Sequence, residues 1–94
     1  MSDSKQFVRA VEFEGVTYEV DVRRLKSREF LRRFMAVQRD AESLVAAVDL
    51  LDYVFDGDLG DAVAATAEAN VGYEDYEEIM RIEAGVLEAA GAKN

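Results

Sequence analysis

Two short segments rich in β-branched and aromatic residues, separated by only two residues, constrain the fold of this chain more than any other feature of its sequence. Residues 7–13 read FVRAVEF and residues 16–22 read VTYEVDV. The dipeptide Glu14-Gly15 between them supplies a glycine, which adopts positive φ without steric cost. This pattern predicts an antiparallel β-hairpin closed by a two-residue turn.

The length of the turn also sets which residues of the hairpin face each other. Across a two-residue connection Phe13 faces Val16, and the other pairs follow by counting outward. The pairs expected on one face are Phe13 with Val16, Val11 with Tyr18, Arg9 with Val20 and Phe7 with Val22. This face is apolar except for Arg9. Because a lone hairpin is only marginally stable in water, we expect its apolar face to pack against helices.

The rest of the chain predicts four helices. They are expected over residues 28–39, 41–55, 61–69 and 73–90. Ser27 is a suitable N-cap for the first helix and Asp40 for the second, since both side chains accept hydrogen bonds from free backbone N–H groups. We therefore expect an α+β fold, mainly α, in the order ββαααα. It forms a single domain of residues 1–94, with a hairpin over 7–22 and a helical part over 27–91.

Apolar residues recur at three- and four-residue spacing in these helices and mark the faces expected to enter the core. In the first helix they are Phe30, Leu31, Phe34, Val37 and, along the same stripe, Gln38. In the second helix they are Leu44, Ala47, Val48, Leu51, Val54 and Phe55, flanked by Leu50, and in the last Tyr76, Ile79, Met80, Ile82, Val86, Leu87 and Ala90. The apolar sector of the second helix is broad, which predicts a central position.

The composition excludes several classes of chemistry. The chain of 94 residues contains no His and no Cys, which removes the usual nucleophilic triads, zinc sites and disulfides. Residues 1–5 lack the cationic start of a signal peptide, and no run approaches the roughly 18 apolar residues of a membrane span. We therefore expect a soluble cytoplasmic protein that is not an enzyme, needs no cofactor or metal, and does not contact a membrane.

Charge is distributed unevenly along the chain. There are 20 acidic and 11 basic residues, giving a net charge of −9, yet seven of the basic residues fall within residues 23–39. Arg28, Arg32, Met35 and Arg39 recur at spacings that align them on one stripe of the first helix. A flexible methionine among arginines is typical of surfaces that bind another protein. The alternative is that these arginines neutralise acidic helices of the same domain.

Two specific ligands are not expected. Nucleic acid is disfavoured because the net charge of −9 repels phosphate, and no groove-reading motif accompanies the basic segment. Residues 56–61, DGDLGD, place acids as at the start of a calcium loop, but Asp61 stands at the sixth position, where Gly is needed, and Ala67 at the twelfth, where Glu is needed. This segment is better explained as a polar turn between helices.

Two charged residues fall on faces expected to be buried. Arg9 lies on the apolar face of the hairpin, and Glu83 lies in the apolar sector of the last helix. Burial would raise the pKa of a carboxyl group and fit it for acid or base chemistry, but no second carboxylate or nucleophile stands at a fixed spacing. We expect an ion pair instead, between Glu83 and Arg9 or Arg33.

Four consecutive pieces of the chain together resemble the tail assembly chaperones of long-tailed bacteriophages. They read FVRAVEFEGVTYEVDV, SREFLRRFMAVQRD, AESLVAAVDLLDYVFDGDLGDAV and YEDYEEIMRIEAGVLEAAG. The resemblance extends from residue 7 to residue 91. The most telling stretch is residues 50–58, LLDYVFDGD, an apolar helix end followed by a glycine and acidic turn.

This resemblance implies a non-enzymatic role in building the phage tail. Proteins of the family bind the tape measure protein, keep its long hydrophobic helices soluble and help to recruit the tail tube protein. They act in the cytoplasm of the host and are absent from the mature virion. A longer form made by ribosomal frameshifting is common in the family, and the end of this chain at residues 91–94, GAKN, is compatible with the short form.

A chaperone of this kind needs a surface for an amphipathic helix, and it gains reach by forming homo-oligomers. The candidate partner-binding residues are Arg28, Arg32, Met35 and Arg39 on the first helix, with Val45 and Tyr53, expected to be exposed, on the second. Two other classes of function remain open. One is an acidic inhibitor that mimics DNA, which the net charge of −9 would serve and the basic segment would spoil. The other is a small homo-oligomeric adaptor.

Overall fold

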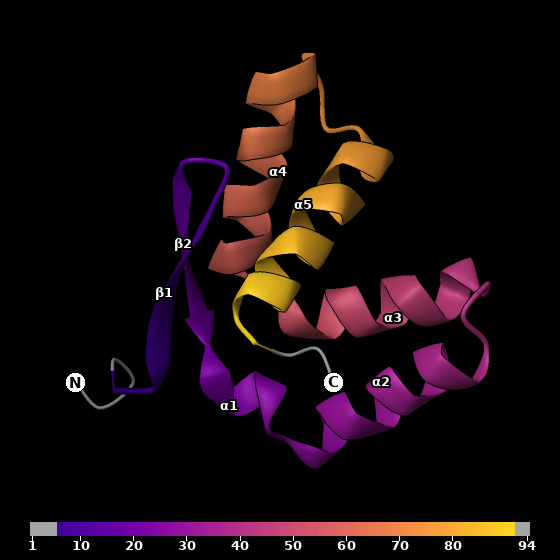
Figure 1. Cartoon of the computed structure of the whole chain (residues 1–94). Helices are drawn as coiled ribbons and strands as arrows, with labels where there is room; N and C mark the ends of the chain where they lie inside the picture. The colour runs from indigo at the N-terminus through magenta and orange to yellow at the C-terminus, as the bar shows by residue number, and fades with distance from the viewer. Residues whose placement is uncertain (1–5, 92–94) are drawn as a thin grey trace.

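The computed structural model describes residues 6–91 and confirms an α+β fold that is mainly α. The elements are β1 (Val8–Phe13), β2 (Val16–Asp21), α1 (Val22–Leu25), α2 (Arg28–Arg39), α3 (Leu44–Val54), α4 (Asp58–Val71) and α5 (Tyr76–Ala89). The helices α4 and α5 form one pair, and the hairpin packs against both of them (Figure 1). The helices α2 and α3 form a second pair, which contacts the first through α3 and α5. The interpretations of residues 1–5 and 92–94 lie outside the described residues.

The predicted hairpin register is confirmed from Phe13–Val16 to Arg9–Val20. Glu14 and Gly15 both have positive φ, 53° and 83°, as the tight hairpin turn requires. Both strands are one residue shorter at their outer ends than predicted. The expected pairing of Phe7 with Val22 is absent from the ladder, because Val22 already begins α1.

The turn of the hairpin is attached to α5 by Arg81. Its guanidinium donates two hydrogen bonds to the carboxylate of Glu14, at 2.7 and 3.0 Å, and two more to Glu78. Hydrogen bonds from Arg81 lower the pKa of Glu14, and those from Arg81 and Asn70 lower the pKa of Glu78 to about 2. A residue with positive φ is thus held by side-chain contacts to a helix 67 positions away in sequence.

A glycine lets β1 approach α5 closely. A Cβ atom on Gly85 would lie 2.2 Å from Cε1 of Phe13, so only the missing side chain leaves room for this ring. The guanidinium carbon of Arg81 lies over the Phe13 ring, 5.9 Å from the centroid of that ring. Packing and the ion pairs of Arg81 therefore act at the same contact between the hairpin and α5.

The predicted N-cap of α2 is confirmed, and the predicted N-cap of α3 is wrong. Ser27 caps α2 as expected, with its Oγ accepting from the Phe30 N–H at 3.0 Å. Asp40 does not cap the next helix: it ends α2, and Ser43 caps α3 by accepting from the Ala46 N–H. The short helix α1 was not predicted, although Asp21 is a good N-cap and accepts from the Arg23 N–H.

The last two helices also differ from the prediction at their ends. The structure places α4 over Asp58–Val71, longer at both ends than the expected residues 61–69. Its C-cap is Gly72 in the left-handed conformation, φ 97°. The start of α5 is capped by Asp75, whose side chain accepts from the Glu78 N–H, so that helix begins three residues later than predicted.

One apolar core joins the hairpin to the helices. Its buried members are Val11, Tyr18, Val20, Phe30, Leu50, Leu51, Val54, Phe55, Val63, Ala67, Ile82, Val86 and Ala90. Four residues that the helical pattern assigned to core faces are instead exposed: Gln38, Leu31 by 55%, Leu44 by 57% and Tyr76 by 61%. The helical period identifies an apolar sector, but the neighbouring elements decide how much of that sector they cover.

The expected ion pair of Glu83 is not present. Arg9 is exposed, and its Nη1 donates to the Ala90 carbonyl at 2.7 Å. Arg33 pairs with Glu29 and Asp49. Within residues 6–91 Glu83 has no ion-pair partner, and burial together with the nearby charge of Asp52 raises its pKa to about 7.

We predict that Glu83 makes the stability of the protein fall as pH rises from 5 to 8. Its pKa is raised from 4.5 to about 7 on folding, so the folded state favours the neutral form and loses up to about 3 kcal/mol once the group ionises. Glu83→Gln should remove this loss and stabilise the protein more at pH 8 than at pH 5. Urea unfolding at both pH values measures the difference, with Glu77→Gln on the exposed part of α5 as the control. A pH-independent effect of Glu83→Gln would contradict the raised pKa.

We predict that Gly60→Ala destabilises the protein by about 1–3 kcal/mol, because the new Cβ would lie 2.4 Å from the carbonyl oxygen of Phe55. Helix propensity alone predicts the opposite sign, a gain of up to about 1 kcal/mol. Thermal or urea unfolding measures the change, and Ala65→Gly, on the exposed part of α4, reports propensity without the clash. A stabilising Gly60→Ala would show that the contact with Phe55 does not constrain α4.

Candidate functional site

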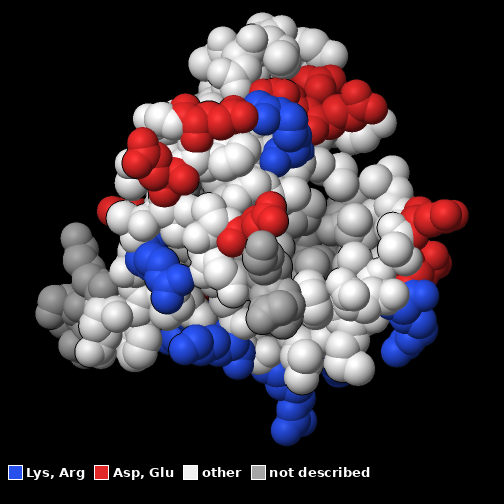
Figure 2. Space-filling model, in the orientation of Figure 1, with Lys and Arg blue, Asp and Glu red and all other residues white. Residues whose placement is uncertain are grey.

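Basic and acidic side chains occupy different parts of the surface. Figure 2 shows most of the Lys and Arg side chains along the part of the molecule formed by α1 and α2, and many Asp and Glu side chains toward α4 and α5. The basic residues of α1 and α2 fall into two groups. Three of them form ion pairs of 3.5 Å or less within the chain: Arg23 with Asp21, Arg24 with Asp56, and Arg33 with Glu29 and Asp49. For this group the intramolecular alternative holds.

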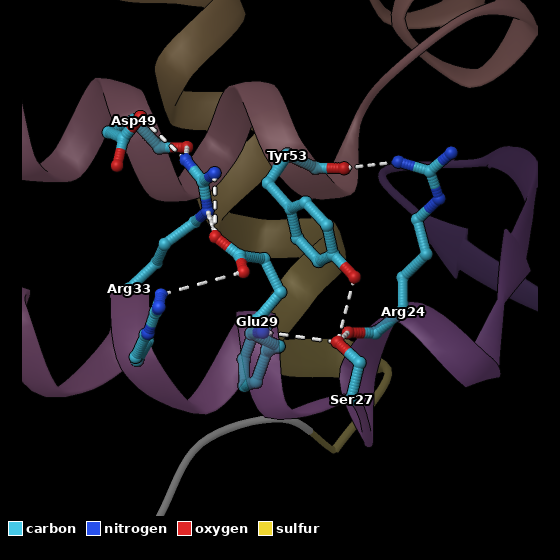
Figure 3. Close-up of polar contacts among 8 residues, drawn as sticks. Arg24, Ser27, Glu29, Arg33, Asp49 and Tyr53 are labelled. Carbon is cyan, nitrogen blue, oxygen red and sulfur yellow. Dashed lines mark hydrogen bonds and ion pairs between the residues drawn. The ribbon is translucent and has the colours of Figure 1, made fainter.

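Tyr53 lies at the centre of the contacts that hold α1 and α2 to α3 (Figure 3). Its hydroxyl and Ser27 Oγ share a hydrogen bond of 2.7 Å, and its backbone carbonyl accepts from Arg24. The guanidinium groups of Arg24 and Arg33 lie 5.4 and 5.3 Å from the centre of its ring. Tyr53 was predicted to be exposed for docking. It is half-buried, and its contacts are structural.

The second group of basic residues projects from the outer face of α2. Arg28, Arg32, Met35 and Arg39 are all exposed, Met35 by 50%. Arg28 and Arg39 form no ion pair with any residue between 6 and 91, and Arg32 reaches Glu29 only at 3.9 Å. These four residues, the outer stripe of α2, therefore keep largely uncompensated positive charge around an exposed apolar side chain.

A groove lies beside the outer stripe, between α1, α2 and the end of α5. Its volume is about 650 Å³. Its apolar walls come from Val22, Leu25, Phe30, Leu31, Phe34 and Ala90, and its charged walls from Arg9, Lys26 and Arg28. None of the described residues that line it is acidic. Leu31 belongs to this groove and, on the helix, lies next to the outer stripe.

The groove is held open by the same contacts that fix the helices. Arg9 is anchored by its hydrogen bond to the Ala90 carbonyl, at the end of α5. Ser27 caps α2 and bonds to Tyr53, which fixes the start of α2 against α3. Phe30 and Phe34 stack at 5.8 Å between ring centroids along the core side of α2. Most walls of the groove therefore come from β1, α1 and α2, and Lys26, Ser27 and Gly91 come from the connections at the ends of the helices.

Val45 is exposed by 79%, as predicted, but the structure does not bring it into the groove. With Leu44 and Val48 it lines a smaller hollow of about 360 Å³, whose other walls are the acidic residues Asp49 and Asp52. The predicted docking residues thus divide between two surfaces of opposite charge. We base the candidate site on the groove and the outer stripe of α2.

Sequence reasoning missed most of the groove. Leu31 and Phe34 were assigned to the core, and Val22 and Leu25 belong to the helix that was not predicted. One signal was present: Leu31 stands at the edge of the apolar sector, next to Arg28 and Met35 on the helical surface.

The remaining polar features point to structure rather than chemistry. Asp56 pairs with Arg24 at 3.5 Å, and Asp58 and Asp61 stand in the first turn of α4, where carboxylates are favourable. In the part of the chain that the structure describes, no group of three or more His, Cys, Asp or Glu side chains is placed to hold a metal ion. Among the same residues no helix has the length and apolarity to cross a bilayer.

Comparison of the chain with models of protein families, with characterised proteins and with solved structures found no match. The features that bear on function are therefore the groove, the outer stripe of α2 and the resemblance in sequence.

We predict that Tyr53→Phe lowers the free energy of unfolding by about 1 kcal/mol, because Ser27 loses a half-buried hydrogen-bond partner. Tyr76→Phe is the control, since Tyr76 is exposed by 61% and removal of its hydroxyl should change stability by less than about 0.5 kcal/mol. Urea unfolding of both variants measures the effect. Equal effects would contradict the structural role given to the Tyr53 hydroxyl.

Proposed function

We propose that this protein is a non-enzymatic tail assembly chaperone of a long-tailed bacteriophage. It binds the tape measure protein in the cytoplasm of the host, keeps it soluble while the tail is built, and is absent from the mature virion. The observation that carries the proposal is the apolar groove beside the outer stripe of α2, in which Arg28 and Arg39 have no ion pair with residues 6–91. The resemblance of residues 7–91 to this family supplies the identity of the partner.

The surface has the properties that such a chaperone needs. An aggregation-prone helix must be bound through its apolar side chains, and the walls formed by Phe30, Leu31 and Phe34 offer apolar contact. The complex must also stay soluble, and a net charge of −9 opposes association between complexes. Binding of this kind requires no catalytic group, which agrees with a chain that lacks His and Cys.

The proposal has three further parts, of which the second partner and the longer form come from the family resemblance and the homo-oligomer from the length of the helix to be covered. The tail tube protein is a second partner, recruited once the tape measure protein is bound. Several copies act together as a homo-oligomer, because a groove of about 650 Å³ covers only a short part of a long helix. A longer form with the same N-terminal region arises by ribosomal frameshifting.

The encoding DNA gives the first test. We expect an overlapping reading frame at the end of this gene and, shortly downstream, a gene for a very long helical protein. A gene that stands alone or beside restriction or repressor genes would contradict the proposal and favour an acidic inhibitor.

Co-expression gives the second test. We predict that the protein raises the soluble fraction of the downstream long helical protein several-fold, because the groove covers its apolar segments. Leu31→Asp combined with Met35→Asp should abolish this gain, since both side chains are exposed and lie at the site. Val45→Asp, an equally polar change on the acidic hollow, is the matched control and should retain it. No gain in solubility with the unaltered protein would refute the proposed function.

A further inference from the structure

The groove has walls of one charge only, in a chain that is strongly acidic. Its charged walls are Arg9, Lys26 and Arg28, and the outer stripe of α2 continues the positive charge along the helix. Acidic residues outnumber basic ones by 20 to 11, so carboxylates are abundant elsewhere in the chain. Even so, Arg28 and Arg39 have no carboxylate partner within residues 6–91.

We propose that this groove binds an amphipathic helix whose apolar stripe is flanked by Asp and Glu residues. The inference rests on the proposed function and specifies which segments of the partner are bound. Apolar side chains of the helix enter the groove between Leu25, Leu31 and Phe34, and the flanking carboxylates meet the arginines of the outer stripe. When a helix binds in a groove, its apolar side chains supply the affinity, and its charged side chains determine which partner binds and in which register.

The spacing of the outer stripe fits a helical partner. Arg28 and Arg39 are eleven positions apart, which corresponds to ~16 Å along α2, or about three helical turns. A helix lying alongside α2 presents acidic residues at the same spacing when they recur every three or four positions. Met35, exposed by 50% between Arg32 and Arg39, adapts its shape to an apolar residue of the partner.

The chemistry of the groove argues against the other occupants. A phosphate backbone has no apolar side chains to fill the walls formed by Phe30 and Phe34, and the acidic remainder of the surface repels it. A basic amphipathic helix would be attracted by the net charge of −9 but would place its cations against Lys26 and Arg28. The local charge and the overall charge therefore predict opposite partners, and this makes the inference testable.

The test uses two synthetic 18-residue helical peptides with the same stripe of leucines. One carries Glu on both sides of the stripe and the other carries Lys. Fluorescence anisotropy measures their binding to the full-length protein at low ionic strength. We expect the Glu peptide to bind at least about tenfold more tightly, with an affinity that falls as salt is added. Equal or tighter binding of the Lys peptide would overturn the inference.

Matched variants locate the binding. Leu31→Asp should weaken the Glu peptide at least about tenfold, since it places a carboxylate in the apolar wall of the groove. Arg28→Gln should weaken it by about two- to fivefold. Arg23→Gln makes the same change in net charge at a residue that pairs with Asp21 outside the groove, and should have a smaller effect. An unchanged affinity in Leu31→Asp would overturn the inference.

Analytical sedimentation of the protein without peptide tests whether the groove is occupied by a second copy of this chain instead of a partner helix. Self-association that Leu31→Asp abolishes would assign the groove to another copy of this chain and overturn the inference. The proposed function is tested independently by co-expression. If the Glu peptide binds but the downstream protein gains no solubility, the proposed function is refuted and the inference about the groove is retained. If the downstream protein gains solubility but the Glu peptide does not bind, only this inference is refuted.

Discussion

The hydrogen bond between the hydroxyl of Tyr53 and Ser27 Oγ is the contact on which the surface of α2 depends. Ser27 ends the link from α1, caps α2 and is joined to α3 by this one bond of 2.7 Å. Arg24 and Arg33 close over the two sides of the tyrosine ring, so the start of α2 has one position relative to α3. Ser27 lines the groove between α2 and the end of α5, so one wall of the groove is fixed by a contact with α3. Tyr53 supports the candidate site without forming part of it.

The arginines of the chain differ in whether a carboxylate lies beside them. Arg81 and Arg33 each face two carboxylates and tie elements that are distant in sequence, the hairpin to α5 and α2 to α3. Exposed ion pairs contribute little individually, but a guanidinium held at two carboxylates restricts orientation. Arg28 and Arg39 have no such partners in residues 6–91 and stay free to contact another molecule. Identical side chains therefore have different surroundings, which only the packed structure shows.

Local features of the sequence were predictable, and their limits are physical. The hairpin register followed from residue alternation and a two-residue turn, both of which are short-range. Asp40 and Ser43 are equally good N-caps in isolation, and the choice of Ser43 depends on how α2 ends. A helix of four residues, α1, has too few positions to show a period. The exposure of Leu31 depends on the position of α5, a long-range property that a helical wheel does not contain.

An exposed apolar groove favours aggregation, and the net charge of this chain opposes it. Leu31 and Met35 are half-exposed beside the groove, an arrangement that favours association between copies. The chain as a whole carries a net charge of −9, which opposes close approach of like molecules. A ligand that places carboxylates against Arg28 and Arg32 overcomes this repulsion locally, because charges in contact interact more strongly than charges separated by more than a Debye length. In the proposed complex, separation of the basic and acidic surfaces therefore lets the protein resist nonspecific aggregation while its groove binds an apolar helix.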